Sequence, residues 1–410
     1  MEAKVSYFLQ KKHWTVFWVL IFGSFCLKAQ MRTIQSGNFT FNVPEEYFKE
    51  RGDIPSFWIS TVDEVAEFLY RQVRKGQIEI VGHSAGRRPV RAVVYGNARQ
   101  GKGTTTFSGS LGFRDVRTYI GRDHEKTVYW GMADVHGFEI EGTVGMVNLI
   151  SVLETGKDLR GKAWPEIAEL VTKIDRLILI PIVNPDGRAR VPIRMGLQRG
   201  SDLTASAYLT NGGWPDGTVV GWPQVKEFIP LDFGKPVYPG GYPNDAGVNI
   251  MHDDFFGKRQ PETQALFDLA ERERPDLIIN MHTGADYMLV LRPFCEPVLT
   301  AVFDELFKYV HRRLTTENLQ FTQNVERETN PRRVSAGAYN LDTALNLHCG
   351  ALSVCVESPS HQWDRPMSGG KVAVHTPDML LDAQLTCHQE AMRFLVEKGG
   401  RSKWTPSQNN

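Results

Sequence analysis

The sequence lacks an excess of charge of either sign, because its 410 residues carry 47 Lys and Arg against 47 Asp and Glu. A chain without a basic surplus has no global attraction to nucleic acid or to an anionic membrane, so we expect no nucleic-acid partner. Internal repeats and low-complexity tracts are also missing, which argues against a repeat array. Any binding or catalytic site is therefore expected in a local group of residues.

A hydrophobic run long enough to span a bilayer is missing too. The longest apolar stretch runs over 13 residues from Trp14 to Cys26, and such a helix reaches about 20 Å against a hydrocarbon core of about 30 Å. A basic start, a short apolar stretch and a small residue at its exit are typical of a secretory signal peptide over 1–29, cut near Ala29 or Gln30. We therefore expect an exported protein (periplasmic, cell-surface or secreted) without a stable membrane span after cleavage; an uncleaved anchor is the alternative.

Cysteine is scarce, and no two cysteines form a CxxC pair, which excludes a zinc-finger type of site. An oxidising compartment would permit disulfides between the cysteines that remain after cleavage, but four cysteines allow three pairings and the sequence selects none. These four are Cys295, Cys349, Cys355 and Cys387.

Apolar runs of strand type alternate with helical patterns along the chain. A capping box, Thr61 to Glu64, begins the first helix, and Thr376-Pro377 begins the last. Strand-type runs cover 77–81, 90–96, 127–135, 174–183, 276–284 and 350–360, and helical patterns cover 62–75, 143–154, 261–275, 298–317 and 378–398. The alternation predicts an α/β fold with a single mixed, mostly parallel twisted sheet and helices on both faces.

The expected organisation is an N-terminal extension over 30–59, one large domain over 60–400 and a short tail over 401–410. One segment within the domain differs from the rest: residues 200–246 are crowded with Gly, Pro, Trp and Tyr and show no helical period. A long irregular segment is uncommon in a compact domain. It is either a binding loop or a surface insertion with aromatic packing of its own.

Four polar side chains occupy equivalent places after predicted strands. His136 and Glu139 follow the strand over 127–135, and His282 and Glu357 each stand at the end of a later apolar run. Ligands of open α/β sheets bind at the carboxyl ends of strands. Two His and one Glu form the ligand set of a catalytic zinc site, and the second Glu is available as a base. Each of these residues on its own is most simply explained as a solvated polar side chain at the end of a strand. The four together indicate a metal site.

Several motifs resemble those of the zinc carboxypeptidases of the carboxypeptidase A type. The resemblance implies that the chain is a divergent, bacterial-type exported member of that family. "HGFEIEG" resembles the His-x-x-Glu ligand pair of that family, "NPDG" at 184–187 its strand-end turn, and "NMHTG" its third-ligand strand. "VCVESPS" stands about as far beyond His282 as the catalytic Glu of the family does, and the order holds from roughly residue 60 to 400. The resemblance implies a zinc carboxypeptidase-like α/β/α fold.

The resemblance also implies the roles of the four residues. One Zn²⁺ per chain would be bound by His136, Glu139 and His282. Glu357 would act as the general base toward the attacking water and then return the proton to the leaving amine. The implied protein is a metallopeptidase, and its partner a peptide substrate.

The chain also departs from the family pattern. Asn249 stands where the family has an Asp that supports a zinc-binding His, and Met251-His252 replaces the Asn-Arg pair that grips the terminal carboxylate of the substrate. By spacing, Arg199 fits best as the substrate-binding, oxyanion-stabilising Arg, and Tyr339 resembles the mobile substrate-binding Tyr of the family. Other arginines near the same position are Arg188, Arg190 and Arg194.

The expected function is zinc-dependent hydrolysis of peptide bonds by a metallo-carboxypeptidase. Because the pair that grips the terminal carboxylate of the substrate is replaced, two alternatives remain. One is a zinc-dependent deacylase of N-acyl amino acids, like the desuccinylases and aspartoacylases, and the other is a cell-wall peptide amidase. A fold retained only for binding would lack a ligand or the Glu, and neither is lacking. A serine hydrolase built on Ser84 in "GHSAG" is a remote alternative, because the nucleophile elbow needs a following helix and a β-rich run follows here.

Overall fold

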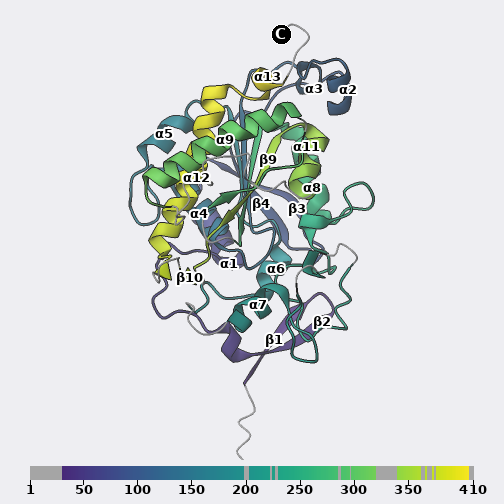
Figure 1. Cartoon of the computed structure of the whole chain (residues 1–410), viewed down its shortest axis with the longest axis vertical. Coiled ribbons are helices and arrows are strands. Elements are labelled where there is room, and N and C mark those ends of the chain that lie inside the picture. Colours follow the sequence, from purple (N-terminus) through teal and green to yellow (C-terminus); the bar gives the residue numbers. More distant parts are fainter. Residues whose placement is uncertain are drawn as a thin grey trace, which may run out of the picture.

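A seven-stranded sheet lies at the centre of the computed structural model (Figure 1). The expected signal segment 1–29 lies outside the described residues. No helix in the described part of the chain combines the length and the apolar character needed to cross a membrane. The structure describes residues 30–197, 203–221, 224–226, 230–284, 288–295, 297–319, 339–361, 365–366, 372–373 and 375–405.

The sheet has the strand order β3-β4-β6-β5-β7-β9-β8. Four adjacent strands, β6, β5, β7 and β9, run parallel, whereas β3, β4 and β8 pair antiparallel at the two sides. This is the mixed, mostly parallel sheet that the sequence predicts. The strands are β3 Gln77–His83, β4 Pro89–Gly96, β5 Val128–Ala133, β6 Arg176–Ile180, β7 Leu277–Thr283, β8 Leu289–Val290 and β9 Leu352–Ser358.

Helices cover both faces of the sheet (Figure 1). Alternate residues of β5 enter different cores: Tyr129 and Ala133 pack with α4, α9 and α12, while Trp130 and Met132 pack with α8 and α11. This alternation follows from the period of two along a strand. The α-helices are α1 Val62–Gln72, α2 Phe107–Gly112, α3 Arg117–Ile120, α4 Glu141–Thr155, α5 Pro165–Val171, α6 Pro185–Arg190, α7 Leu203–Asn211, α8 Pro261–Glu273, α9 Pro297–Thr316, α11 Leu341–Cys349, α12 Pro377–Lys398 and α13 Arg401–Trp404.

The residues that the sequence marks as helix ends cap helices in the structure. Thr61 caps α1, with the reciprocal contact from the Glu64 side chain that completes a capping box. Thr376 caps α12, which ends before Gly399 at φ 76°. The "NPDG" turn differs from expectation, because Asn184 caps a short helix there, α6.

Residues 30–48 and the described residues of 203–246 pack together, and we call them the insertion lobe. Its N-terminal hairpin and α7 lie at the lower end of the molecule (Figure 1). The expectation of no helix in the insertion is wrong: α7 forms at its start, where small and apolar residues precede the Gly- and Pro-rich part. The remaining elements are β1 Met31–Ser36, β2 Phe39–Pro44, η1 Glu45–Phe48, η2 Gln224–Lys226, η3 Ile250–His252, β10 Arg365–Pro366 and β11 Val372–Ala373.

Aromatic rings hold the insertion lobe together. Phe41 on β2 packs edge-on against Phe233 and Tyr238, with ring centroids 5.9 and 6.2 Å apart. Tyr47 contacts Tyr208 on α7 at 4.9 Å. The insertion therefore has aromatic packing of its own, and the N-terminal extension supplies part of that packing.

Buried charges fasten the lobe to the sheet domain. The Asp245 carboxylate accepts hydrogen bonds from Arg190 at 2.7 Å and from Arg88 at 2.8 Å. Arg88 also pairs with Asp186 at 2.7 Å. Because Asp186 and Asp245 are almost completely buried, loss of either partner would leave an unpaired charge in a low-dielectric interior.

Candidate metal centre and active site

The loop after β5 carries His136 and Glu139. The Gly137 N–H donates to the Gly241 carbonyl at 2.9 Å, so the insertion lobe holds this loop directly. A Cβ at position 137 would lie 2.1 Å from the Gly187 carbonyl carbon, and only glycine permits that approach. The Glu139 N–H donates to the His136 carbonyl at 3.0 Å, which makes a tight turn.

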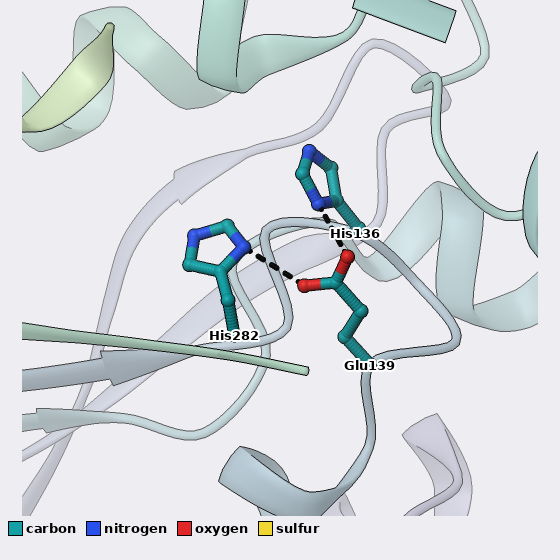
Figure 2. Close-up of side chains that lie close together, drawn as sticks. All are labelled: His136, Glu139 and His282. Carbon is teal, nitrogen blue, oxygen red and sulfur yellow. Dashed lines mark hydrogen bonds and ion pairs between the residues drawn. The ribbon is translucent and has the colours of Figure 1, made fainter. Parts of the chain in front are cut away.

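Three side chains converge at this loop. His136 Nδ1 lies 2.8 Å from Glu139 Oε1, and His282 Nδ1 lies 2.8 Å from Glu139 Oε2. Figure 2 shows the two imidazoles pointing at different oxygens of one carboxylate. The ligand atoms of the three residues all lie within 4.8 Å of one another. The structure thus brings together the three residues that the sequence predicts as metal ligands.

His136 is oriented from two sides. Its Nε2 lies 3.0 Å from Asn249 Oδ1, which leaves Nδ1 facing Glu139. The ring of Tyr242 stacks on the imidazole, with centroids 3.9 Å apart and planes inclined by 12°. The Tyr242 hydroxyl donates to Glu139 Oε1 at 3.1 Å. A tyrosine of the insertion lobe therefore touches two of the three candidate ligands.

The electrostatics of the cluster favour a charged Glu139. Burial raises the pKa of the Glu139 carboxyl, but the charges and hydrogen bonds of His136 and His282 outweigh burial and hold that pKa well below its usual range. Burial lowers the pKa of His282, and the charge and hydrogen bond of Glu139 outweigh it to give a pKa of about 9. The buried carboxylate thus attracts positive charge to this position.

The donor set fits Zn²⁺. Two imidazole nitrogens and one carboxylate make up the three-ligand set of catalytic zinc sites, which keep one position open. The contact of His136 Nε2 with Asn249 is the kind of outer contact that orients a metal-binding imidazole. In the part of the chain that the structure describes, His282 Nε2 has no hydrogen-bond partner, so its Nδ1 is the nitrogen engaged at the cluster.

Glu357 stands beside the metal-ligand candidates on β9. It is the register partner of His282 across the parallel β7–β9 pair. Cys355, two residues earlier on the same face of β9, has its Sγ 3.8 Å from Glu357 Oε1. Burial raises the pKa of the Cys355 thiol well above its usual value. A thiol that stays protonated is a poor metal ligand.

Other predicted site residues lie elsewhere or are held in structural contacts. Arg199 lies outside the described residues, so its role stays a prediction. Tyr339 is 42% exposed and packs against Phe255 and Phe256 with ring centroids 6.0 Å away in both cases. Its role in substrate binding also stays a prediction.

The arginines considered as replacements for the clamp have structural partners. Arg188 and Arg190 are buried. Arg188 donates to backbone carbonyls of Ser60 and Ile193, and Arg190 pairs with Asp245. Arg194 pairs with Glu64 at 2.7 Å. These contacts occupy the three guanidinium groups within the fold.

Ser84 does not sit in a nucleophile elbow. It lies between β3 and β4, which form an antiparallel hairpin, so no helix follows it. Its hydroxyl donates to Asp186 Oδ1 at 2.5 Å and accepts from the Arg88 N–H at 2.9 Å. Ser84 is a buried structural residue of the turn, and the structure gives no support to the serine-hydrolase alternative.

Sequence reasoning missed Tyr242 and a second buried pair, Glu141 and His361. The Glu141 carboxylate accepts from the Thr283 hydroxyl at 2.8 Å and lies 2.7 Å from His361 Nδ1, so it supports the strand end beside His282. The sequence offered one signal for Glu141, which stands two residues after Glu139 in "FEIEG". Nothing near Tyr242 in the sequence marks it.

The sequence matches the model of a family described as zinc carboxypeptidase over residues 73–345, more than half of the chain. Its structure is similar to a metallo-carboxypeptidase from Burkholderia cenocepacia, with 13% identity, a TM-score of 0.50, and 89% of this chain and 81% of that chain covered. It is also similar to a metallo-carboxypeptidase from Pseudomonas aeruginosa in complex with (2-guanidinoethylmercapto)succinic acid, with 14% identity, a TM-score of 0.50, and 90% and 80% covered. At these identities the structural matches show a common fold. No curated protein matches the sequence.

Proposed function

The chain belongs to the zinc carboxypeptidase family, and from this premise we propose that it is an exported metallo-carboxypeptidase that binds one Zn²⁺ and acts on peptides. The observation that carries the proposal is the convergence of His136 Nδ1 and His282 Nδ1 on the two oxygens of Glu139. Export rests on the predicted signal peptide over 1–29 alone.

The chain's own residues divide the proposed work between them. His136, Glu139 and His282 would hold the ion, which when bound polarises the scissile carbonyl and makes water more acidic. Glu357 takes the proton from the attacking water and returns it to the leaving amine. Asn249 and Tyr242 keep the His136 ring and the Glu139 carboxylate in place.

A second candidate is a zinc-dependent deacylase of N-acyl amino acids or a cell-wall peptide amidase. Met251 favours it: this residue, which replaces the Asn of the usual clamp, is buried, and its sulfur lies 3.8 Å from the Asn280 amide nitrogen. A thioether cannot bind a carboxylate as an amide does. Recognition of a free C-terminus would therefore need other groups.

Product analysis of a mixed peptide pool tests the proposal. The mature protein is incubated with the pool, with and without a zinc chelator, and the products are identified by mass spectrometry. Chelator-sensitive removal of single C-terminal residues is the expected result. Internal cuts would point to the amidase, and release of acyl groups from N-acyl amino acids without peptide cleavage would point to the deacylase.

Glu357→Gln separates chemistry from metal binding. The amide cannot accept a proton at neutral pH, so turnover should fall by about a thousandfold or more, while zinc remains at about one per chain because the three-ligand set is intact. Turnover close to that of the wild type in this variant would remove Glu357 from the mechanism.

A further inference from the structure

Two carboxylates hold the end of β7 just beyond His282. The Thr283 N–H donates to Glu139 Oε2 at 3.2 Å, and the Thr283 hydroxyl donates to Glu141 Oε2 at 2.8 Å. Glu139 lies in the loop before α4, and Glu141 is the first residue of that helix. Because one bond holds the backbone of Thr283 and the other holds its side chain, the two bonds together fix this strand end against the start of α4.

The Glu141 carboxylate also holds the chain beyond Glu357. Its Oε1 accepts from the His361 N–H at 2.7 Å and lies 2.7 Å from His361 Nδ1. The Gly196 N–H donates to His361 Nε2 at 3.1 Å, so Nε2 carries no proton and Nδ1 is the donor to Glu141. Both side chains of the Glu141–His361 pair are buried, and a hydrogen bond to a charged group is stronger in such an interior than in water.

The ends of β7 and β9 are also bound to each other. The Thr283 hydroxyl lies 3.3 Å from the Ser358 hydroxyl, and the Gly284 N–H donates to the Ser358 carbonyl at 3.1 Å. A Cβ at position 284 would lie 2.9 Å from Glu357 Oε2, so the Glu357 carboxylate lies against the backbone that directly follows Thr283. A shift of Thr283 would therefore move the surface on which that carboxylate rests.

We infer that Glu141, together with His361, is a positioning residue for Glu357: it fixes both strand ends and so sets where the Glu357 carboxylate stands relative to the metal-ligand candidates. The inference rests on the proposed function for the role of Glu357 as general base. A general base must lie within hydrogen-bond reach of the proton that it takes, and a misplacement of about 1 Å can cost about a hundredfold in rate. Loss of the positioning should therefore lower kcat and spare the metal.

Thr283→Val tests the contact with β7. Valine keeps the shape of threonine and the backbone bond to Glu139, but it has no hydroxyl to donate to Glu141. We expect kcat to fall about tenfold or more, with KM within about twofold of the wild-type value. Zinc should remain at about one per chain, because the three ligands are unchanged. Loss of the zinc, or a raised KM with an unchanged kcat, would overturn the inference.

Thr143→Val is the matched control, because it also removes a hydrogen-bonded threonine hydroxyl. Thr143 is buried on α4, and its hydroxyl donates to the Pro181 carbonyl at 2.9 Å. Pro181 directly follows β6, which pairs with neither β7 nor β9. This variant should keep the wild-type kcat. An equal loss of kcat in Thr143→Val and Thr283→Val would mean that both act through stability alone, which contradicts the inference.

Two substitutions of His361 separate its two contacts. The amide nitrogen of Asn stands as many bonds from the backbone as Nδ1, so His361→Asn keeps a donor to Glu141 and loses the acceptor for Gly196. The amide oxygen of Gln stands as far out as Nε2, so His361→Gln keeps that acceptor and loses the donor. We expect His361→Asn to retain most of kcat, and His361→Gln to lose about as much as Thr283→Val. The reverse order would show that His361 acts through Gly196 and would overturn the inference.

Crystal structures of the zinc-loaded proteins separate this inference from the proposed function, because they show the Glu357 carboxylate whether or not peptides are cleaved. A carboxylate that is displaced in Thr283→Val but not in Thr143→Val supports the inference even if no peptidase activity is found. A carboxylate that stays in place in Thr283→Val would refute the positioning role and leave the peptidase standing.

Discussion

The strand ends of the sheet and the insertion lobe meet at the same site but are built in different ways. His282 and Glu357 are placed by the register of two parallel strands, which repeats at every residue along β7 and β9. Tyr242 is placed by a lobe whose parts are held by aromatic contacts and which buried ion pairs fasten to the sheet domain. The sheet supplies the metal-ligand candidates, and the lobe orients them.

The difference predicts a graded response to substitution. Ligands bind the ion directly, so their loss removes the site, whereas the lobe acts through ring orientation and hydrogen bonds. Changes at the strand ends should therefore abolish function, and changes in the lobe should tune it. The following variants test this comparison, from the largest expected effect to the smallest.

His282→Ala should cause the largest effect. With two of three ligands left, zinc content after dialysis should fall from about one per chain to near zero, and activity should fall with it. Metal analysis by mass spectrometry measures the content. His83→Ala, an exposed histidine of β3, is the control and should keep the metal. Full zinc occupancy in His282→Ala would contradict the assignment of His282 as a zinc ligand.

Glu262→Gln tests the junction between lobe and sheet domain. Glu262 lies in the first turn of α8 and accepts hydrogen bonds from the Ala85 N–H and the Asn244 amide, both at 3.1 Å. Burial raises its pKa from 4.5 to about 7, and the charge of Asp186 acts in the same direction, against these hydrogen bonds. Because the folded protein favours the protonated form, this group stabilises the fold below pH 4.5 and loses that stabilisation as pH rises through 7.

The neutral Gln should remove this pH dependence. The free energy of unfolding of the wild type should fall relative to that of Glu262→Gln between pH 4.5 and 7, by on the order of 3 kcal/mol. Urea unfolding of both proteins across that range measures the difference, and groups that titrate alike in both cancel. Parallel curves would show that Glu262 is charged in the folded protein.

Tyr242→Phe tests whether a hydrogen bond from the lobe affects zinc binding at the metal centre. The ring and its stacking on His136 remain, but the hydrogen bond to Glu139 is lost. Zinc affinity should fall about tenfold, as for other residues that support metal ligands. Competition with a chelating dye measures the affinity, and the visible spectrum of the Co²⁺ form should shift.

Tyr238→Phe controls for the loss of a hydroxyl within the same lobe. The Tyr238 hydroxyl donates to the Arg190 carbonyl at 2.8 Å and so supports the lobe without touching the ligand candidates. It should leave the Co²⁺ spectrum unchanged. Equal effects of the two variants would mean that Tyr242 acts only through the stability of the lobe.

Asn249→Asp should have the smallest effect, in the opposite direction. A carboxylate opposite His136 Nε2 makes the imidazole more basic, so zinc affinity should rise. The gain should stay below about tenfold, because the Asp cannot donate to the Val225 carbonyl as Asn249 does. Dye competition measures it, and a drop in affinity would show that the Val225 contact matters more than the charge.

The fold was predictable from local signals. Thr61 and Thr376 mark helix starts by their own hydrogen bonds with nearby backbone, and the apolar runs mark the central strands. Such signals depend on residues a few positions apart. Helix α7 was not predicted, because the glycines and prolines that follow it dominate the composition of the segment.

His136, Glu139, His282 and Glu357 could be predicted because each follows a recognisable strand, and the ends of adjacent parallel strands converge in any such sheet. The amino-acid sequence by itself determined this ligand set, the helix starts at Thr61 and Thr376, and the mixed sheet. Only the tertiary structure decided the rest. The Tyr242 hydroxyl meets the Glu139 carboxylate, although the two residues are 103 positions apart in the sequence. Such contacts follow from how the lobe packs on the domain, and no local period encodes that packing.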